Sequence, residues 1–211
     1  MNRKTPSRIL LTLLLISAFA AIPMTVYAQD HDVAVTDVKT FKSLCGLTLS
    51  PFDIVYENYT LTINATVENH GTSSESFDVV GKYDDTVFDT VATTLAIGEI
   101  KNVTLEWDTH DVAKGTYNII VNANLTTDEY PDDNTYEYGA VTVTWLGDQD
   151  GNLELDPDDF WYLCAYFITY YKPGKGYLDR TILFDFNEDC IINEDDLFIF
   201  SESWINYYTS P

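Results

Sequence analysis

An alternation of apolar and polar residues runs from His31 to Trp145 of this 211-residue chain. Residues 59–67 show it clearly, because Tyr59, Leu61 and Ile63 alternate with threonine and asparagine. Successive side chains of a strand point to opposite faces of a sheet, so this pattern is typical of half-buried antiparallel strands. Seven such strands in about 115 residues indicate an immunoglobulin-like β-sandwich. The predicted strands are residues 32–41, 58–69, 76–83, 86–93, 99–107, 116–124 and 135–145.

The first 28 residues have the features of a secretory signal peptide. They begin with three basic residues, continue with the apolar run 9–22 and end with Val26-Tyr27-Ala28, which has small residues where a signal peptidase cleaves. A retained membrane anchor is the alternative, but the apolar run is shorter than the ~20 residues that a membrane span needs. We therefore expect residues 1–28 to be removed and the protein to be secreted.

The charge balance limits the classes of partner. The chain has 34 acidic residues against 11 Lys and Arg, which gives a net charge of −23 at pH 7. Proteins that bind nucleic acid rely largely on Lys and Arg to neutralise phosphates, so no nucleic-acid partner is expected. A surface this negative instead attracts multivalent cations.

The period changes after Trp145, where two similar segments follow each other. In each, an acidic run, residues 148–159 or 185–196, precedes an apolar stripe at helical spacing. Residues 148–171 and 185–208 therefore form an internal repeat of loop and helix. We expect the two helices to bury their stripes against each other. The stripes are Phe160, Leu163, Phe167 and Tyr171, and Leu197, Phe200, Trp204 and Tyr208.

Both acidic runs place oxygen donors at the spacing of a calcium-binding loop. Places in each run are counted from its first aspartate, Asp148 or Asp185. Calcium takes six to eight oxygen ligands, and such a loop supplies them from places 1, 3, 5, 7, 9 and 12, with a backbone carbonyl at place 7. Magnesium fits less well, because it keeps more of its water ligands. The sequence thus predicts two calcium sites. The predicted ligands are Asp148, Asp150, Asn152, Glu154, Asp156 and Asp159 in the first run, and Asp185, Asn187, Asp189, Ile191, Asn193 and Asp196 in the second.

Three further places of these loops bear on the prediction. Place 8 holds Leu155 and Ile192, which can turn inward to a core. Place 6 normally holds glycine, but here it holds Leu153 and Cys190, and a side chain in the left-handed conformation costs about 1–2 kcal/mol. Place 12 holds Asp instead of the usual Glu, which shortens the bidentate arm.

The first part of the chain, residues 29–146, resembles the CARDB family, an adhesion-related sandwich module of bacterial and archaeal surface proteins. The resemblance lies in the strings HDVAVTDV, LTINATVENHG, LEWDT, AKGTYNIIVNAN and DDNTYEYGAVTV. It implies an immunoglobulin-type sandwich without catalytic residues.

The last part, residues 147–211, resembles the dockerin family in its strings GDQDGNLELDPDDF and DFNEDCIINEDDLF. Dockerins attach secreted proteins, often polysaccharide-degrading enzymes, to cohesin domains. The resemblance implies a calcium-dependent module that docks onto a cohesin-like domain of another secreted or cell-surface protein. It also implies that places 10 and 11 help to select the partner, namely Pro157, Asp158, Glu194 and Asp195.

Sequons and cysteines leave alternatives open. Asn58, Asn64, Asn102 and Asn124 each begin an Asn-x-Thr sequence, which permits glycosylation of an exported protein. Asparagine and threonine also simply populate exposed strand faces. A Cys164–Cys190 bridge is compatible with an oxidising compartment. The alternative is that all three cysteines are small buried hydrophobic residues.

No catalytic residues are predicted. His31, His70 and His110 are isolated and lack the spacing of a metal site.

A carbohydrate-binding sandwich with a structural calcium-bound cap is the alternative function, with Tyr56, Tyr83 and Tyr136 as exposed platforms for a polysaccharide. Trp107 and Trp145 lie on the inward parity, which is typical of a core. The sequence therefore predicts a mainly β, secreted, non-catalytic adhesion or assembly protein: a sandwich followed by a small α module of two calcium loop-helix repeats.

Overall fold

The structure is a computed structural model that describes residues 31–44, 46–170 and 181–209. The predicted signal peptide lies outside these residues. All seven predicted strands are present, together with two short strands, so the fold is mainly β. The strands are β1 (Val33–Leu44), β2 (Leu47–Leu49), β3 (Ile54–Tyr56), β4 (Thr60–Asn69), β5 (Glu75–Tyr83), β6 (Thr86–Leu95), β7 (Ile100–Asp108), β8 (Gly115–Asn124) and β9 (Thr135–Thr144).

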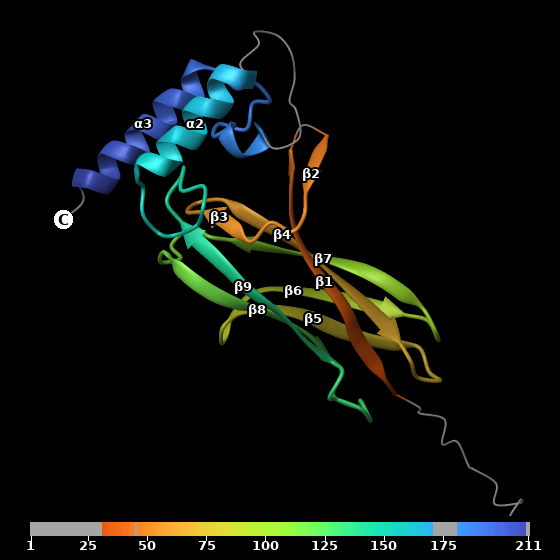
Figure 1. Cartoon of the computed structure of the whole chain (residues 1–211). Coiled ribbons are helices and arrows are strands. Elements are labelled where there is room, and N and C mark those ends of the chain that lie inside the picture. Colours follow the sequence, from red (N-terminus) through yellow and green to blue (C-terminus); the bar gives the residue numbers. More distant parts are fainter. Residues whose placement is uncertain (1–30, 45, 171–180, 210–211) are drawn as a thin grey trace, which may run out of the picture.

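The strands form two sheets that pack as a sandwich (Figure 1). One sheet has the order β2-β1-β4-β7 and the other has the order β3-β9-β8-β5-β6. The inward residues of the alternating pattern form the core between them, and Leu61, Ile63 and Trp107 are fully buried there. The predicted immunoglobulin-like sandwich is confirmed, as is the inward position of Trp107.

The segment before β4 forms the two strands that the sequence did not predict. Strand β2 pairs with β1, and β3 runs parallel to β9 at the edge of the second sheet. Each has only three residues, which is too few for a period of two to be recognised. Strand β3 matters for the site, because it lies at the end of the sandwich where the helices sit (Figure 1).

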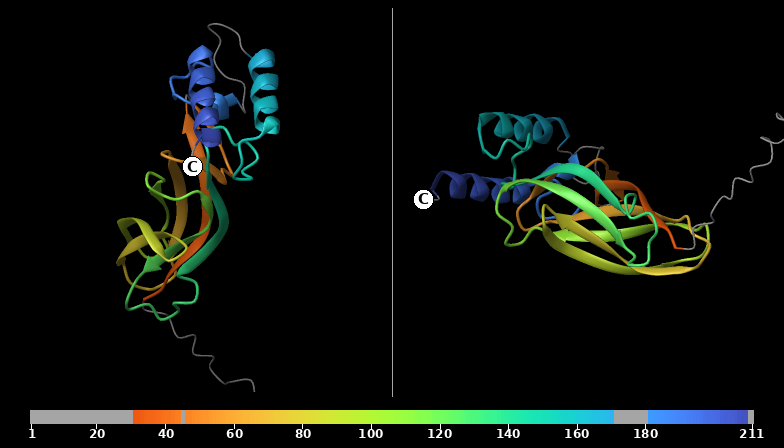
Figure 2. Two further views of the ribbon diagram at one scale, coloured as in Figure 1. Left: turned by 90° about the vertical axis from the view of Figure 1, so that its left-hand side faces the viewer. Right: turned by 90° about the horizontal axis from the view of Figure 1, so that it is seen from below.

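The C-terminal part consists of α2 (Pro157–Tyr170), the 3-10 turn η1 (Thr181–Phe184) and α3 (Glu194–Thr209). Both long helices lie at one end of the sandwich in all views (Figure 2). Each begins next to a side chain that caps its amino end. Asp156 accepts a hydrogen bond from the Asp158 N–H at 2.8 Å, and Asn193 accepts one from the Asp195 N–H at 2.6 Å. No helix in the described part of the chain is long and apolar enough to span a membrane.

The predicted packing of the two helix stripes is present only in part. The ring of Phe160 lies 6.3 Å from that of Phe200 and 6.1 Å from that of Trp204, between ring centres. Phe160 and Tyr208 nevertheless remain exposed, at 47% and 59%. The side chains of Phe167 and Tyr171 lie outside the described residues.

A second core forms where the helices meet the end of the sandwich. Phe200 of α3 stacks on Phe186 with ring centres 6.2 Å apart, and Phe186 lies 6.1 Å from Tyr56 of β3. Leu155 and Leu163 are buried in the same cluster. The buried helix residues Leu163 and Phe200 therefore pack in a core that the helices share with the acidic loops and the end of the sandwich.

The connection between β9 and the first acidic run depends on Gly147. Its φ of +100° is in the region that favours glycine, and a Cβ atom there would lie 2.5 Å from the Phe200 ring. Only two residues, Leu146 and Gly147, separate Trp145 from Asp148. The link is thus short and closely packed, as the lack of a flexible spacer in the sequence indicates.

Candidate functional site

The first acidic run, here called loop one (residues 148–159), is organised by two buried carboxylates. Asp148, at place 1, is fully buried and accepts hydrogen bonds from the backbone N–H groups of Gly151 at 2.8 Å and Leu153 at 2.9 Å. Asp159, at place 12, accepts bonds from Gln149 at 2.8 Å and Asp156 at 3.0 Å. The first and last acids of the loop therefore hold its backbone in a closed turn.

Loop two (residues 185–196) repeats this arrangement. Asp185, at place 1, accepts a bond at 2.9 Å from the N–H of Cys190, the same place that Leu153 has in loop one. Asp196, at place 12, accepts bonds from Phe186 and Asn193 at 2.8 Å each, again at the same places as in loop one. The sequence repeat is thus also a repeat in hydrogen bonding.

The backbone at place 6 takes the left-handed conformation in both loops. Leu153 and Cys190 each have a φ of +72°. The turn that glycine usually makes is therefore formed by residues with side chains, at a cost of about 1–2 kcal/mol each. The two other left-handed residues of the loops, Gly151 and Glu188, also share one place, place 4.

Burial raises the pKa of all four organising carboxylates. It raises the pKa of Asp185 to about 6, and the neighbouring carboxylate of Asp196 adds to the increase. Burial likewise raises the pKa values of Asp148, Asp159 and Asp196. None of the salt bridges within the described residues reaches these four side chains. Burying an ionised carboxylate without a cation is costly, so a bound cation would stabilise the ionised form of these four carboxylates.

Loop one brings three carboxylates close enough to share a metal ion. One oxygen each of Asp148, Asp150 and Asp159 lies within 4.8 Å of the others. Asp150 is exposed, so the group opens to solvent on one side. In loop two, asparagines occupy places 3 and 9, so amide oxygens stand where loop one has carboxylates.

The other predicted ligands lie around these acids. At place 5, Asn152 Nδ2 donates to Asp150 at 3.2 Å, and at place 3 of loop two Asn187 Nδ2 donates to Asp189 at 3.0 Å. The remaining predicted ligands lie within the same loops and are exposed or half-buried: Glu154, Asp156, Ile191 and Asn193.

Several residues of the sandwich hold loop one, and sequence reasoning missed them. The hydroxyl of Thr144, the last residue of β9, donates to Asp148, and Gln149 Nε2 donates to the Tyr56 hydroxyl at 2.6 Å. A Cβ atom on Gly151 would lie 2.9 Å from Ile54 of β3. Thr144 has the outward parity of its strand and is nevertheless fully buried, where its hydroxyl contacts Asp148.

Loop two also rests on the sandwich. Lys42 of β1 forms a 2.8 Å salt bridge with Glu188, and its Nζ lies 4.7 Å from the centre of the Tyr59 ring. The Tyr59 hydroxyl donates to the backbone carbonyl of Phe186. Both loops are therefore anchored to the end of the sandwich.

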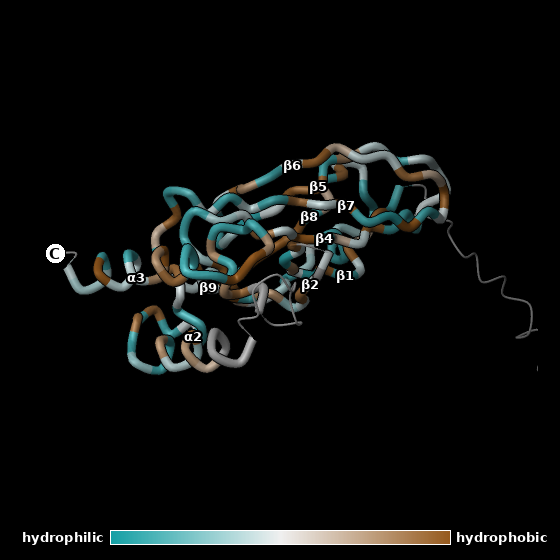
Figure 3. The backbone as a smooth tube through the Cα atoms, turned by 90° about the horizontal axis from the view of Figure 1, so that it is seen from above, coloured by the Kyte–Doolittle hydropathy of each residue, from teal (hydrophilic) through white to brown (hydrophobic). Residues whose placement is uncertain are grey.

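The helices expose a group of large apolar side chains. Seven of the twelve most exposed large hydrophobic residues within the described part of the chain lie on α2 or α3, including Trp161 at 70% and Phe198 at 61%. Apolar stretches are visible on both helices in Figure 3. A hollow of about 350 Å³ opens between the helices. It is lined by Phe160, Leu197, Phe200, Ser201, Trp204 and Ile205.

The four residues predicted to select a partner lie at the starts of these helices. Pro157 and Asp158 begin α2, and Glu194 and Asp195 begin α3, and all four are exposed. They are thus placed where a partner could contact them.

Both predictions about the cysteines are wrong. Cys190 is disulfide-bonded and Cys164 is free, so the Cys164–Cys190 bridge does not form. Cys190 is also exposed, so it is not a small buried hydrophobic residue. Cys45 lies outside the described residues.

The sequon asparagines lie on or near the outer faces of the strands. Asn58, Asn102 and Asn124 are exposed, and Asn64 is half-buried. Two of the sequons are linked across β4 and β7, because the Thr66 hydroxyl donates to Asn102 at 2.8 Å and the Thr104 hydroxyl donates to Asn64 at 2.7 Å.

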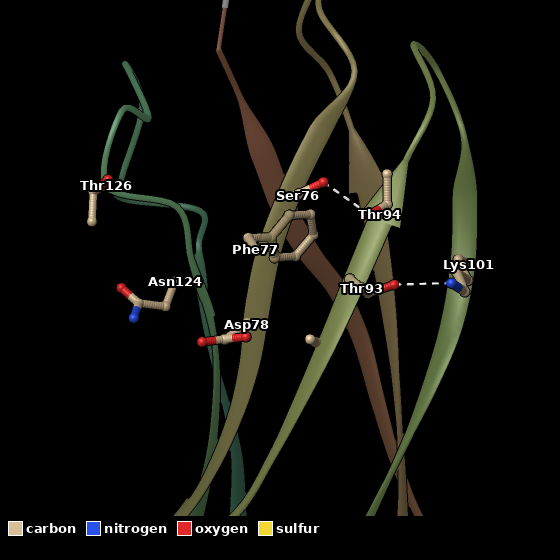
Figure 4. Close-up of a pocket in the computed structure, with 9 residues that line it drawn as sticks. Ser76, Phe77, Asp78, Thr93, Thr94, Lys101, Asn124 and Thr126 are labelled. Atoms are coloured by element: carbon tan, nitrogen blue, oxygen red, sulfur yellow. Dashed lines mark hydrogen bonds between the residues drawn. The ribbon is translucent and has the colours of Figure 1, made fainter.

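Of the predicted tyrosine platforms for a polysaccharide, Tyr56 is wrong, and Tyr83 and Tyr136 are only half-exposed. Tyr56 is only 4% exposed, because loop one covers it. Tyr83 stacks on Trp107 with ring centres 5.0 Å apart, and Tyr136 packs against the core. A separate polar hollow of about 680 Å³ lies along β5 and β6 (Figure 4), where the side chain of Lys101 donates to that of Thr93. The ring that lines this hollow, Phe77, is only 6% exposed, so it offers no stacking surface for a sugar.

The comparisons with known proteins concern the sandwich. The sequence model of the CARDB family matches residues 47–138. This stretch is a CARDB domain. The match begins after β1, although β1 pairs along most of its length with β4 of the same sandwich. The CARDB domain is a non-catalytic domain.

Several solved structures are similar to part of the chain. A CARDB domain from Pyrococcus furiosus, solved in complex with di-metal ions, aligns with 52% of this chain and 89% of its own, at 19% identity and a TM-score of 0.38. A domain of a putative cell surface protein from Methanosarcina acetivorans aligns over 54% and 92%, at 24% identity and a TM-score of 0.41. A β-glucosidase from Erythrobacter marinus aligns over only 15% of its own chain, at 13% identity and a TM-score of 0.41. A search of curated proteins finds no match.

Proposed function

We propose that the chain is a secreted, non-catalytic adhesion or assembly protein whose C-terminal part binds two calcium ions and docks onto a cohesin-like domain of a partner protein. The observation that carries this proposal is the matched geometry of loops one and two. In both, buried acids at places 1 and 12 hold the same backbone places, and place 6 is left-handed. The CARDB domain and the signal-like start of the chain support a location outside the cell.

Calcium fits the donors of both loops. Calcium takes oxygen ligands, and both loops offer carboxylate, amide and carbonyl oxygens at the required places. A carboxylate has about four acceptor positions, so the backbone bonds to Asp148 and Asp185 leave room for a metal ion. When bound, calcium would supply the positive charge that the buried carboxylates lack.

The exposed face of α2 and α3 supports docking onto another protein. Large exposed apolar side chains, aromatic ones above all, contribute much of the binding energy at protein interfaces. Trp161 and Phe198 are well exposed, and the selecting residues Asp158 and Glu194 lie close to them in sequence. Calcium would act indirectly, by fixing the loops from which both helices start.

A panel of cohesin domains tests the proposal. We expect the immobilised full chain to bind at least one member in calcium and to release it in EGTA. Trp161→Asp and Phe198→Asp should weaken that binding by about tenfold or more, which corresponds to about 1.4 kcal/mol. Ile97→Asp is the matched control, because Ile97 is a 63%-exposed apolar residue on the sandwich, away from the helices.

Two outcomes would contradict docking. One is calcium binding without any cohesin partner. The other is a partner whose affinity falls equally in the Ile97 variant and the helix variants. If the chain instead retained a polysaccharide equally well in calcium and EGTA, the alternative would hold: a carbohydrate-binding sandwich with a structural calcium-bound cap.

A further inference from the structure

We propose a further metal site, separate from the two calcium loops, for a transition-metal dication such as zinc, formed by Asp32, His70 and Asp133 at the end of the sandwich opposite the helices. One donor atom of each residue lies within 4.8 Å of the others. The three residues come from the start of β1, the β4–β5 turn and the β8–β9 connection, which meet at that end (Figure 1). They are 38 and 63 residues apart in sequence, so no local spacing indicates the site.

The two ring nitrogens of His70 face different groups, as they do in a histidine that binds a metal with one nitrogen and a carboxylate with the other. Its Nδ1 faces Asp32 Oδ2 and Asp133 Oδ2, at 3.9 Å each. Its Nε2 lies 3.4 Å from Glu68 Oε2. Metal-bound histidines almost always donate the second ring N–H to a carboxylate or carbonyl, which fixes the orientation of the ring. The Glu68 carboxylate lies on the side of the ring where that partner would be.

Asp32 provides an independent sign of a missing ligand. It is 4% exposed, and its Oδ1 is buried without any hydrogen-bond partner. A buried carboxylate oxygen without a partner is costly and requires an explanation. A bound cation beside it would explain why this acid is buried.

The surrounding charge also favours a cation. Burial raises the pKa of Asp32, and the carboxylates of Asp133 and Asp128 raise it further. His70 is the one basic side chain in contact with this group in the described part of the chain, and it carries at most one positive charge. A dication would balance the excess of negative charge.

Backbone hydrogen bonds hold the three segments in place before any ion binds. The carbonyl of Asp32 accepts bonds from the N–H groups of His70 at 3.0 Å and Gly71 at 3.1 Å. The Val35 N–H donates to the Asp133 carbonyl at 3.0 Å, and the Val33 N–H donates to the Asp128 carboxylate at 2.9 Å. These bonds fix the segments that carry the three donor atoms, which lie within 4.8 Å of one another.

The mixed donors select the class of metal. An imidazole nitrogen with two carboxylates suits zinc and related first-row ions, whereas calcium and magnesium take oxygen ligands. His70 and Asp133 have side chains 40% and 47% exposed, so water can complete the coordination. The ion would tie three separate segments of the sandwich together.

Titration of the untagged full chain with zinc tests the site, in saturating calcium so that the calcium loops are not available. We expect one zinc ion per chain and a rise in the thermal unfolding midpoint. His70→Gln and Asp133→Asn should each weaken zinc binding at least about tenfold, since even outer-shell changes cost 10–100-fold. His110→Gln is the matched control, because that histidine is 66% exposed and distant in the fold. Cobalt absorption should report the His70 ligand and vanish in His70→Gln.

The absence of zinc binding in the unaltered chain would overturn the proposal. So would binding that survives in both His70→Gln and Asp133→Asn, or zinc that is lost on mutation of Asp159 instead. The unfolding midpoints of the metal-free variants show whether they are folded. Neither result depends on whether the chain docks onto a cohesin.

Discussion

Chelation of calcium with EGTA is expected to lower the thermal unfolding midpoint of the C-terminal helices by about 10 °C or more. A ligand at a hundredfold excess over its dissociation constant stabilises the folded state by about 2.7 kcal/mol, and this part of the chain is small enough for such a change to shift its midpoint strongly. The physical reason is the burial of Asp148, Asp159, Asp185 and Asp196, whose charges repel one another without a cation.

Circular dichroism at the helical band measures this effect selectively. The two long helices of the described residues, α2 and α3, both follow the loops, whereas the sandwich consists of strands. Asp111→Asn is the control variant, because it removes an acid that is 90% exposed and outside both loops, and it should leave the response to EGTA unchanged. An unchanged helical midpoint after chelation of the unaltered chain would show that the loops do not depend on calcium.

The two loops are expected to differ in affinity, with loop one filling first. Loop one offers carboxylates at places 1, 3, 9 and 12, whereas loop two offers them only at places 1, 5 and 12. The charge of the ligands tunes calcium affinity, and the strain at place 6 is equal, because Leu153 and Cys190 share a φ of +72°. Turn geometry therefore does not favour either loop.

Calorimetric titration of Asp159→Asn and Asp196→Asn tests this order. Each variant keeps the size of the side chain and removes the charge at place 12 of one loop. Asp159→Asn should abolish the tighter phase, with a loss of affinity of at least about tenfold, and Asp196→Asn the weaker phase. The reverse assignment would show that contacts with the sandwich, such as the salt bridge between Lys42 and Glu188, outweigh the number of charges.

The sandwich was largely predictable because each long strand buries one face. Leu61 and Ile63 show this, since their places in the alternation match their full burial. Leu155 was likewise predicted to turn inward and is fully buried. Strands β2 and β3 escaped prediction because three residues carry no period.

Contacts between distant parts of the chain were not predictable. Tyr56 looks like an exposed aromatic residue in the sequence, but Gln149 and the second core cover it. Thr144 reads as outward-facing and yet binds Asp148. His70 looks isolated, and only the fold brings it next to Asp32 and Asp133. In each case the decisive contact joins residues from different elements, which local patterns do not record.

The central claim is that the C-terminal repeats form two calcium sites, and native mass spectrometry of the full chain tests it most directly. The account predicts two calcium ions per chain, one in Asp159→Asn, one in Asp196→Asn and none in the double variant, with Asp111→Asn retaining both. A chain that holds no calcium, or that holds the same number of ions in every variant, would contradict it.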